Sequence, residues 1–274
     1  MDLYHFDKDG KVHVASINNG IQNEVSYICD PLFTQNFPVC SGWVNLKDFN
    51  GDGIEDLFTF NTDGGVSGIR VFKGFYNADG KLDFTQYFNP QNGEPFLVFA
   101  SSPSPNAFVT NIYATEEDYP AFVDVDYDGD LDILNFGSDG TYVKWYKNVS
   151  TDPEELEFVL GDFCWGGFGE GSLSQEIFLN LEDSINCVVF FNDTNEPSAQ
   201  PLHPGSTLLA FDEDGDQDAS VSESSKKLSK SFLDHTNRRT GAHSLVHATQ
   251  VGSSLTGRGC AGPATPSDRF SSLR

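Results

Sequence analysis

Short apolar runs bounded by turn residues recur along most of this chain. The runs at residues 43–46 and 121–123 each lead into a stretch rich in Asp and Gly, and the runs at residues 57–60 and 133–136 follow those stretches. The runs are short and rich in aromatic and β-branched residues, which is typical of strands rather than helices. The pattern therefore predicts an all-β protein.

The residues that follow each acidic stretch repeat at fixed offsets. Counting from Asp2, Asp56 or Asp132, the chain has a Phe four residues later and an Asp-Gly pair seven and eight residues later. Asp-Gly favours a hairpin turn, and in the two later copies a second apolar run follows, at residues 69–72 and 142–146. Each repeat is therefore expected to contain an acidic loop and at least two strands. The starts lie 54 and 76 residues apart, which fits propeller blades with insertions better than short solenoid repeats.

The two acidic loops, at residues 48–56 and 124–132, have the composition of calcium sites. Both place an oxygen-bearing side chain at loop positions 1, 3, 5 and 9 and glycine at position 6. Calcium prefers six to eight oxygen ligands, and glycine permits the sharp turn that aims alternate side chains inward. The predicted ligands are the side chains of Asp48, Asn50, Asp52 and Asp56 with the carbonyl of Ile54, and the side chains of Asp124, Asp126, Asp128 and Asp132 with the carbonyl of Asp130.

The EF-hand is the best-known calcium-binding motif with such a loop, and the sequence argues against an EF-hand here. An EF-hand loop ends with a bidentate Glu at position 12, where this chain has Thr59 and Asn135. The flanking runs are also predicted to be strands rather than helices.

Beyond these loops, the chain resembles the FG-GAP/VCBS repeat proteins. The likeness is carried by PAFVDVDYDGDLDILNFG at residues 120–137, YKN at 146–148, CWG at 164–166 and GSTLLA at 205–210, and it is closest to the long secreted VCBS-repeat proteins of Bacteroidota. It covers residues 1–218 and implies a partial β-propeller-like array with Ca²⁺ bound on the blade loops. It also implies a secreted or outer-surface bacterial protein.

The function that this resemblance implies is a calcium-stabilised scaffold for adhesion or ligand binding, with an extracellular protein or glycan as partner. An ancillary domain of a secreted carbohydrate-active enzyme is the alternative, and an intracellular calcium sensor is a weaker one. Catalysis by this chain is not favoured, because the sequence has no HExxH, GxSxG or P-loop pattern.

The charge of the chain limits the kinds of molecule that it is expected to bind. The formal net charge is −25 and the isoelectric point is near 4.3. Because contacts to phosphate groups require Lys and Arg, this balance disfavours nucleic acid as a partner. No apolar run is long enough to span a membrane. Much of the negative charge lies in the acidic loops, where carboxylates repel one another unless a cation is bound.

The composition changes after Asp218. Residues 1–218 carry a net charge of −30, whereas residues 219–274 carry +5 and are rich in Ser, Arg, His and Gly without a sustained apolar period. We expect this segment to be a disordered basic tail. Two origins stay open: a natural tail, or a shifted reading frame or assembly artefact. The second is favoured, because the change falls within a repeat's own acidic loop.

Both ends of the repeat array are expected to be incomplete. Asp2 aligns with the closing Asp of a calcium loop whose earlier positions are missing. A third acidic stretch, at residues 212–218, lacks either an oxygen ligand at position 1 or the glycine at position 6, depending on the register. We expect it to bind calcium weakly at best.

Four cysteines lie before the change in composition. For an exported protein we expect Cys29 to pair with Cys40 and Cys164 with Cys187, although sequence alone allows three connectivities, and reduced thiols remain an alternative. Trp165 and Phe168 could stack on a sugar ring if they were exposed, but a place in the core is favoured for a chain this rich in Phe.

Overall fold

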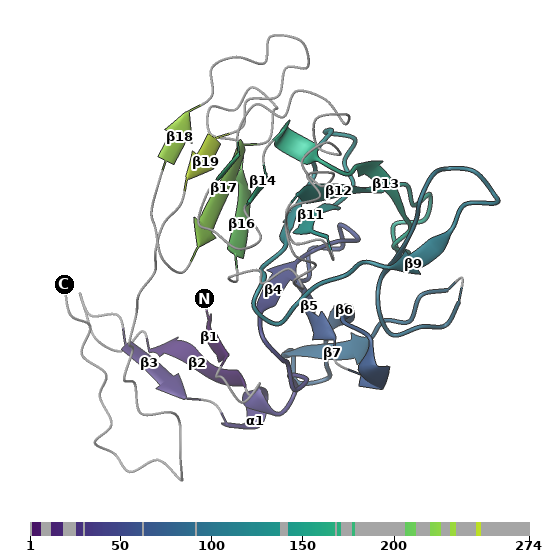
Figure 1. The fold of residues 1–274 in the computed structure, drawn as a ribbon. Coiled ribbons are helices and arrows are strands. Elements are labelled where there is room, and N and C mark those ends of the chain that lie inside the picture. Colours follow the sequence, from purple (N-terminus) through teal and green to yellow (C-terminus); the bar gives the residue numbers. More distant parts are fainter. Residues whose placement is uncertain are drawn as a thin grey trace.

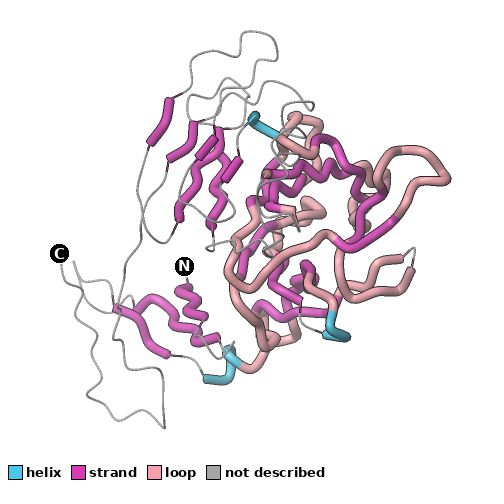
Figure 2. Tube along the Cα trace, viewed as in Figure 1, coloured by secondary structure: helices cyan, strands magenta, loops and turns pink. Residues whose placement is uncertain are grey.

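The computed structural model describes residues 2–6, 12–18, 26–29, 31–61, 63–90, 92–137, 142–167, 169–170, 177–178, 206–211, 220–225, 231–233 and 245–247. Figures 1 and 2 show that its regular elements are almost all strands, so the all-β prediction is confirmed. Within these residues the helical elements are α1 (Pro31–Thr34) and two 3-10 turns (Asp63–Gly65 and Trp165–Gly167). The strands are β1 (Asp2–Phe6), β2 (Val12–Asn18), β3 (Ser26–Cys29), β4 (Val44–Lys47), β5 (Asp56–Asn61), β6 (Gly68–Tyr76), β7 (Leu82–Gln86), β8 (Val98–Ala100), β9 (Val109–Asn111), β10 (Ala121–Val123), β11 (Asp132–Phe136), β12 (Val143–Asn148), β13 (Phe158–Asp162), β14 (Gly169–Glu170), β15 (Ile177–Phe178), β16 (Ser206–Phe211), β17 (Ser220–Ser225), β18 (Ser231–Leu233) and β19 (Leu245–His247).

Two of the sheets are built from the same antiparallel meander. In sheet II the strand order is β4-β5-β6-β7, and in sheet III it is β10-β11-β12-β13, with β8 and β9 added beyond β13. The acidic loops join the first two strands of each meander, β4 to β5 and β10 to β11. The strands β7 and β13 follow the second apolar run of each repeat, beyond the two strands that the repeat pattern predicts. The repeat therefore has four strands, two more than the minimum predicted.

The N-terminal strands form sheet I, with the antiparallel order β1-β2-β3. Asp2 begins β1 as Asp56 begins β5, so the three strands correspond to the last three strands of sheet II.

The sheets pack face to face in the order in which they occur along the chain. Leu57 and Phe72 of sheet II pack in a cluster that includes Val12 and Val14 of sheet I. Their neighbours on the opposite face, Phe58, Ile69 and Val71, pack in a second cluster with residues of sheet III. Because successive side chains of a strand point to opposite faces, sheet II buries both of its faces.

Sheet III is also covered on both faces. Ile133 and Tyr146 face sheet II, whereas Leu134 and Val143 lie in a third cluster with Leu208 of β16. The Leu208 N–H donates a hydrogen bond of 3.0 Å to the carbonyl of Tyr119, just before β10. The described sheets form a stack and no closed ring. Trp165 is buried in the third cluster, as favoured, whereas Phe168 lies outside the described residues.

The predicted pairing of Cys29 with Cys40 is wrong, because Cys40 is a free thiol. The physical reason is its position: Cys40 is 3% exposed and packs between sheets I and II, where its thiol donates to the carbonyl of Pro38 at 3.4 Å. Cys164 is disulfide-bonded, and its predicted partner, Cys187, lies outside the described residues.

Cys40 is expected to resist thiol reagents in the native protein. Burial raises the pKa of its thiol from 9.0 to about 11, so the reactive thiolate is scarce at pH 8. Peptide mapping after maleimide treatment should find Cys40 labelled only when urea is present.

The raised pKa of the Cys40 thiol also makes the free energy of unfolding fall between pH 9 and pH 11, because the thiol ionises first in the unfolded chain. Rapid labelling of the native protein, or a Cys40→Ala variant with the same alkaline decline, would contradict this prediction.

Three short strands lie in the segment after Asp218. β17 pairs with β16, and β18 pairs with β19. The rest of residues 219–274 and the third acidic stretch, at residues 212–218, lie outside the described residues, so the disorder of the tail stays a prediction. In the part of the chain that the structure describes, no helix is long and apolar enough to cross a membrane.

Candidate metal centre

The two acidic loops have the same backbone conformation although they differ in sequence. Gly53 and Gly129, at position 6, have φ angles of 82° and 100°. Gly51 and Tyr127, at position 4, have φ angles of 73° and 59°, and Tyr127 is the one non-glycine residue with positive φ among those described. A left-handed conformation costs an ordinary residue roughly 1–2 kcal/mol, so the rest of the loop holds Tyr127 against its preference.

The position-1 carboxylates organise the turn from within. Asp48 accepts hydrogen bonds from the N–H groups of Gly51 and Gly53, both at 2.8 Å, and from Asp52 at 3.2 Å. Asp124 accepts from Asp128 at 3.1 Å and from Gly129 at 2.9 Å. The loops are therefore folded around their first carboxylate.

The position-9 carboxylates anchor the loops to the sheets. Asp56 and Asp132 are fully buried. Asp56 accepts from the N–H groups of Phe49 at 3.0 Å and Gly74 at 2.8 Å. Asp132 accepts from the corresponding N–H groups of Val125 and Asn148, at 3.0 and 2.7 Å, and its donors also include the indole of Trp145, at 3.0 Å.

Burial raises the pKa of both anchoring carboxyls, to about 6, even though the N–H donors favour the ionised form. A positive charge in the loop would help to keep them ionised. Their role as calcium ligands stays a prediction, as do those of the carbonyls of Ile54 and Asp130.

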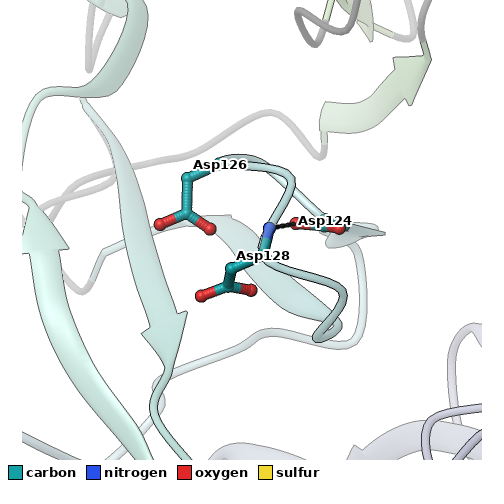
Figure 3. Close-up of side chains that lie close together, drawn as sticks. All are labelled: Asp124, Asp126 and Asp128. Carbon is teal, nitrogen blue, oxygen red and sulfur yellow. Dashed lines mark hydrogen bonds between the residues drawn. The ribbon is translucent and has the colours of Figure 1, made fainter.

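In the second acidic loop, Asp124, Asp126 and Asp128 converge (Figure 3). Each offers a carboxylate oxygen, and these oxygens lie within 4.8 Å of one another. Lys147 of β12 pairs with Asp126 and, at 3.0 Å, with Asp128. Its hydrogen bond to Asp126 is the main reason that the pKa of its ammonium lies well above the usual range. This part of the loop therefore already attracts a cation.

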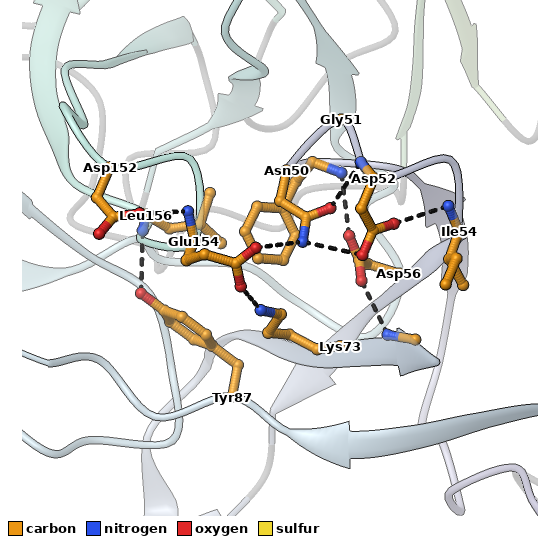
Figure 4. A network of polar contacts seen from close by, with 12 residues as sticks. Asn50, Gly51, Asp52, Ile54, Asp56, Lys73, Tyr87, Asp152, Glu154 and Leu156 are labelled. Carbon is orange, nitrogen blue, oxygen red and sulfur yellow. Dashed lines mark hydrogen bonds and ion pairs between the residues drawn. The ribbon is translucent and has the colours of Figure 1, made fainter. Parts of the chain in front are cut away.

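The first acidic loop makes a different set of contacts (Figure 4). The amide of Asn50, at position 3, donates to Asp52 at 3.2 Å and to Glu154 at 3.1 Å. Glu154 lies between β12 and β13, in the second repeat, and it also pairs with Lys73 of β6. Nearby, the hydroxyl of Tyr87 accepts a hydrogen bond of 3.0 Å from the N–H of Leu156. The segment before β13 is thereby held against the first repeat.

The donor set fits a hard divalent cation. The candidate ligands are carboxylate, amide and carbonyl oxygens, which suit calcium, and neither loop contains a cysteine or histidine. Of the predicted ligands, the structure brings together the side chains at positions 1, 3 and 5 of the second loop, in a cluster that could hold a metal ion.

The sequence interpretation missed Lys73, Lys147 and Glu154. A signal for the lysines was present, because each follows an aromatic residue in the strand after its Asp-Gly turn, at Phe72 and Tyr146. Nothing in the sequence points to Glu154, because its contact with Asn50 joins residues 104 positions apart.

No protein-family model, curated protein or solved structure matches this chain.

Proposed function

We propose that this chain is part of an extracellular β-propeller of the FG-GAP/VCBS type, in which calcium bound at residues 48–56 and 124–132 stabilises a scaffold for adhesion or ligand binding. The ion has a structural role: it neutralises each acidic loop and links the first two strands of the sheet on either side of it.

One observation carries the proposal. The two loops lie at the same place in two equivalent meanders, and in both the first carboxylate organises the turn while the ninth accepts N–H groups from the loop and from the third strand. A surface acidic turn has no need for such a repeated network. A cation-binding loop needs it, because the ligands must be held in place before the ion arrives.

The stacking of the sheets supports the propeller. Sheets I, II and III follow one another in chain order, and sheet II is buried on both faces. In a barrel or a two-layer sandwich, each sheet buries one face in the core and exposes the other to solvent. A propeller blade instead packs against a neighbouring blade on each of its faces.

A binding role draws on side chains that the fold leaves exposed. Tyr76, Phe88 and Phe108 have exposed fractions of 61%, 56% and 70%. Aromatic side chains are favoured in contacts with proteins and sugars, so each of these exposed rings is a candidate contact for an extracellular protein or glycan.

Calcium stoichiometry tests the proposal directly. Asp128→Ala removes the position-5 carboxylate of the second loop, and calorimetric titration of calcium should then show one site fewer than in the unaltered protein. Asp79→Ala is the matched control, because Asp79 is an exposed aspartate in the turn between β6 and β7, outside both loops. Asp214→Ala, in the third acidic stretch, should also leave the stoichiometry unchanged. Loss of a site from all three variants, or no binding by the unaltered protein, would contradict the proposal.

A further inference from the structure

Lys73 and Lys147 occupy the same position in the two repeats. The first apolar residue after each acidic loop is Leu57 in sheet II and Ile133 in sheet III. Leu57 pairs with Phe72 and Ile133 pairs with Tyr146, and the lysine is the next residue in each case. Both side chains therefore start from equivalent places beside an acidic loop. Both are partly exposed, with 30% of the side chain accessible.

The two ammonium groups nevertheless have different partners. Lys147 pairs with Asp126 and Asp128, which are positions 3 and 5 of its own loop. Lys73 pairs with Glu154, which belongs to the other repeat.

The two loops also differ in the residue at position 3, and this explains why the two lysines have different partners. In the second loop it is Asp126, a carboxylate that attracts Lys147. In the first loop it is Asn50, whose amide donates to the same Glu154 that pairs with Lys73. Glu154 thus holds both the amide and the lysine, and the carboxylates of Asp48 and Asp52 are left without an ammonium partner among the contacts described.

We propose that Lys147 is a built-in counter-cation that calcium must displace from the second loop, whereas Glu154 withdraws Lys73 from the first loop. This inference rests on the proposed calcium function, and it concerns how the two sites are regulated. The first loop binds calcium more tightly and fills first. The second loop exchanges an internal cation for an external one, so it fills at a higher calcium concentration and keeps its carboxylates compensated until then.

Calcium titration of single-site proteins separates the two loops. In an Asp48→Ala background, which leaves the second loop, Lys147→Met should tighten calcium binding about five- to tenfold, the effect expected for removing one exposed cation from two carboxylates. Lys147→Arg keeps the charge and should leave the affinity close to that of the parent. In an Asp124→Ala background, which leaves the first loop, Lys73→Met should change the affinity by less than about twofold.

Glu154 provides the reciprocal test in the Asp124→Ala background. Glu154→Gln releases Lys73 toward the loop and should weaken calcium binding several-fold, and adding Lys73→Met should restore it. Circular dichroism of each variant checks that it is folded, and calcium-induced changes in the NMR signals of the remaining loop give a second measure of affinity.

The outcomes are distinct. An unchanged affinity for Lys147→Met, in a protein that still binds calcium, would overturn the displacement by calcium. Failure of Lys73→Met to restore binding would show that Glu154 acts on the ion itself, and would overturn the withdrawal of Lys73. Absence of calcium binding in the unaltered protein would instead contradict the proposed function.

Discussion

Asp132→Ala is expected to lower the free energy of unfolding by about 3–5 kcal/mol, even in the presence of a calcium chelator. The carboxylate is fully buried and accepts hydrogen bonds from Val125, Asn148 and Trp145. Removing it leaves these three donors without their acceptor, and the loss of an acceptor costs about 1–3 kcal/mol for a donor that is buried, as the N–H of Asn148 is. Urea unfolding followed by tryptophan fluorescence measures the loss.

Asp130→Ala is the matched control for this effect. Asp130 lies in the same loop but is only partly buried, and its predicted contact with calcium is through the main-chain carbonyl. Its replacement should change the free energy of unfolding in chelator by less than about 0.5 kcal/mol. If the two variants lost similar amounts of unfolding free energy, Asp132 would act only as one of the loop's negative charges, and its hydrogen bonds would not anchor the loop to the sheet.

Calcium is expected to raise the thermal midpoint of the intact chain. A ligand that binds only the folded state stabilises it by about 2.7 kcal/mol per site at a free concentration one hundred times the dissociation constant. Two filled loops would therefore add about 5 kcal/mol. Melting with calcium and with a chelator measures the shift.

Two controls tie that shift to the loops. A variant with both Asp48→Ala and Asp124→Ala should lose most of the calcium dependence, because both turns lose the carboxylate around which they fold. Magnesium should stabilise less, because it demands a stricter octahedral geometry and gives up its water reluctantly. Equal thermal midpoints in calcium and in chelator would contradict the structural role proposed for calcium.

The elements that sequence predicted well are those specified by local patterns. The acidic loops, the strands on either side of them and the turn at Asp63-Gly64 depend on residues close in the chain, where alternation and glycine placement have direct conformational meaning. The equivalent Asp-Gly pairs at residues 9–10 and 139–140 lie outside the described residues. The same patterns placed Asp124, Asp126 and Asp128 together, as the structure does.

The features that sequence could not supply depend on contacts between distant segments. Nothing local shows that the run at residues 158–160 joins sheet III between β12 and β8, because both pairings are a matter of tertiary arrangement. Cys40 was assigned to a disulfide from cysteine count, whereas its burial between two sheets depends on how those sheets stack.

The contacts of Glu154 also bear on the order in which the protein folds. Its partners Asn50 and Lys73 precede it by 104 and 81 residues. Such nonlocal contacts form late, because a long loop must close before they are gained. At a synthesis rate of about 5–20 residues per second, roughly 5–20 s separate the appearance of Asn50 from that of Glu154 on the ribosome. Over the last 81 residues of that interval, the nascent first loop has its own carboxylates and Lys73 but lacks the glutamate that draws the lysine away.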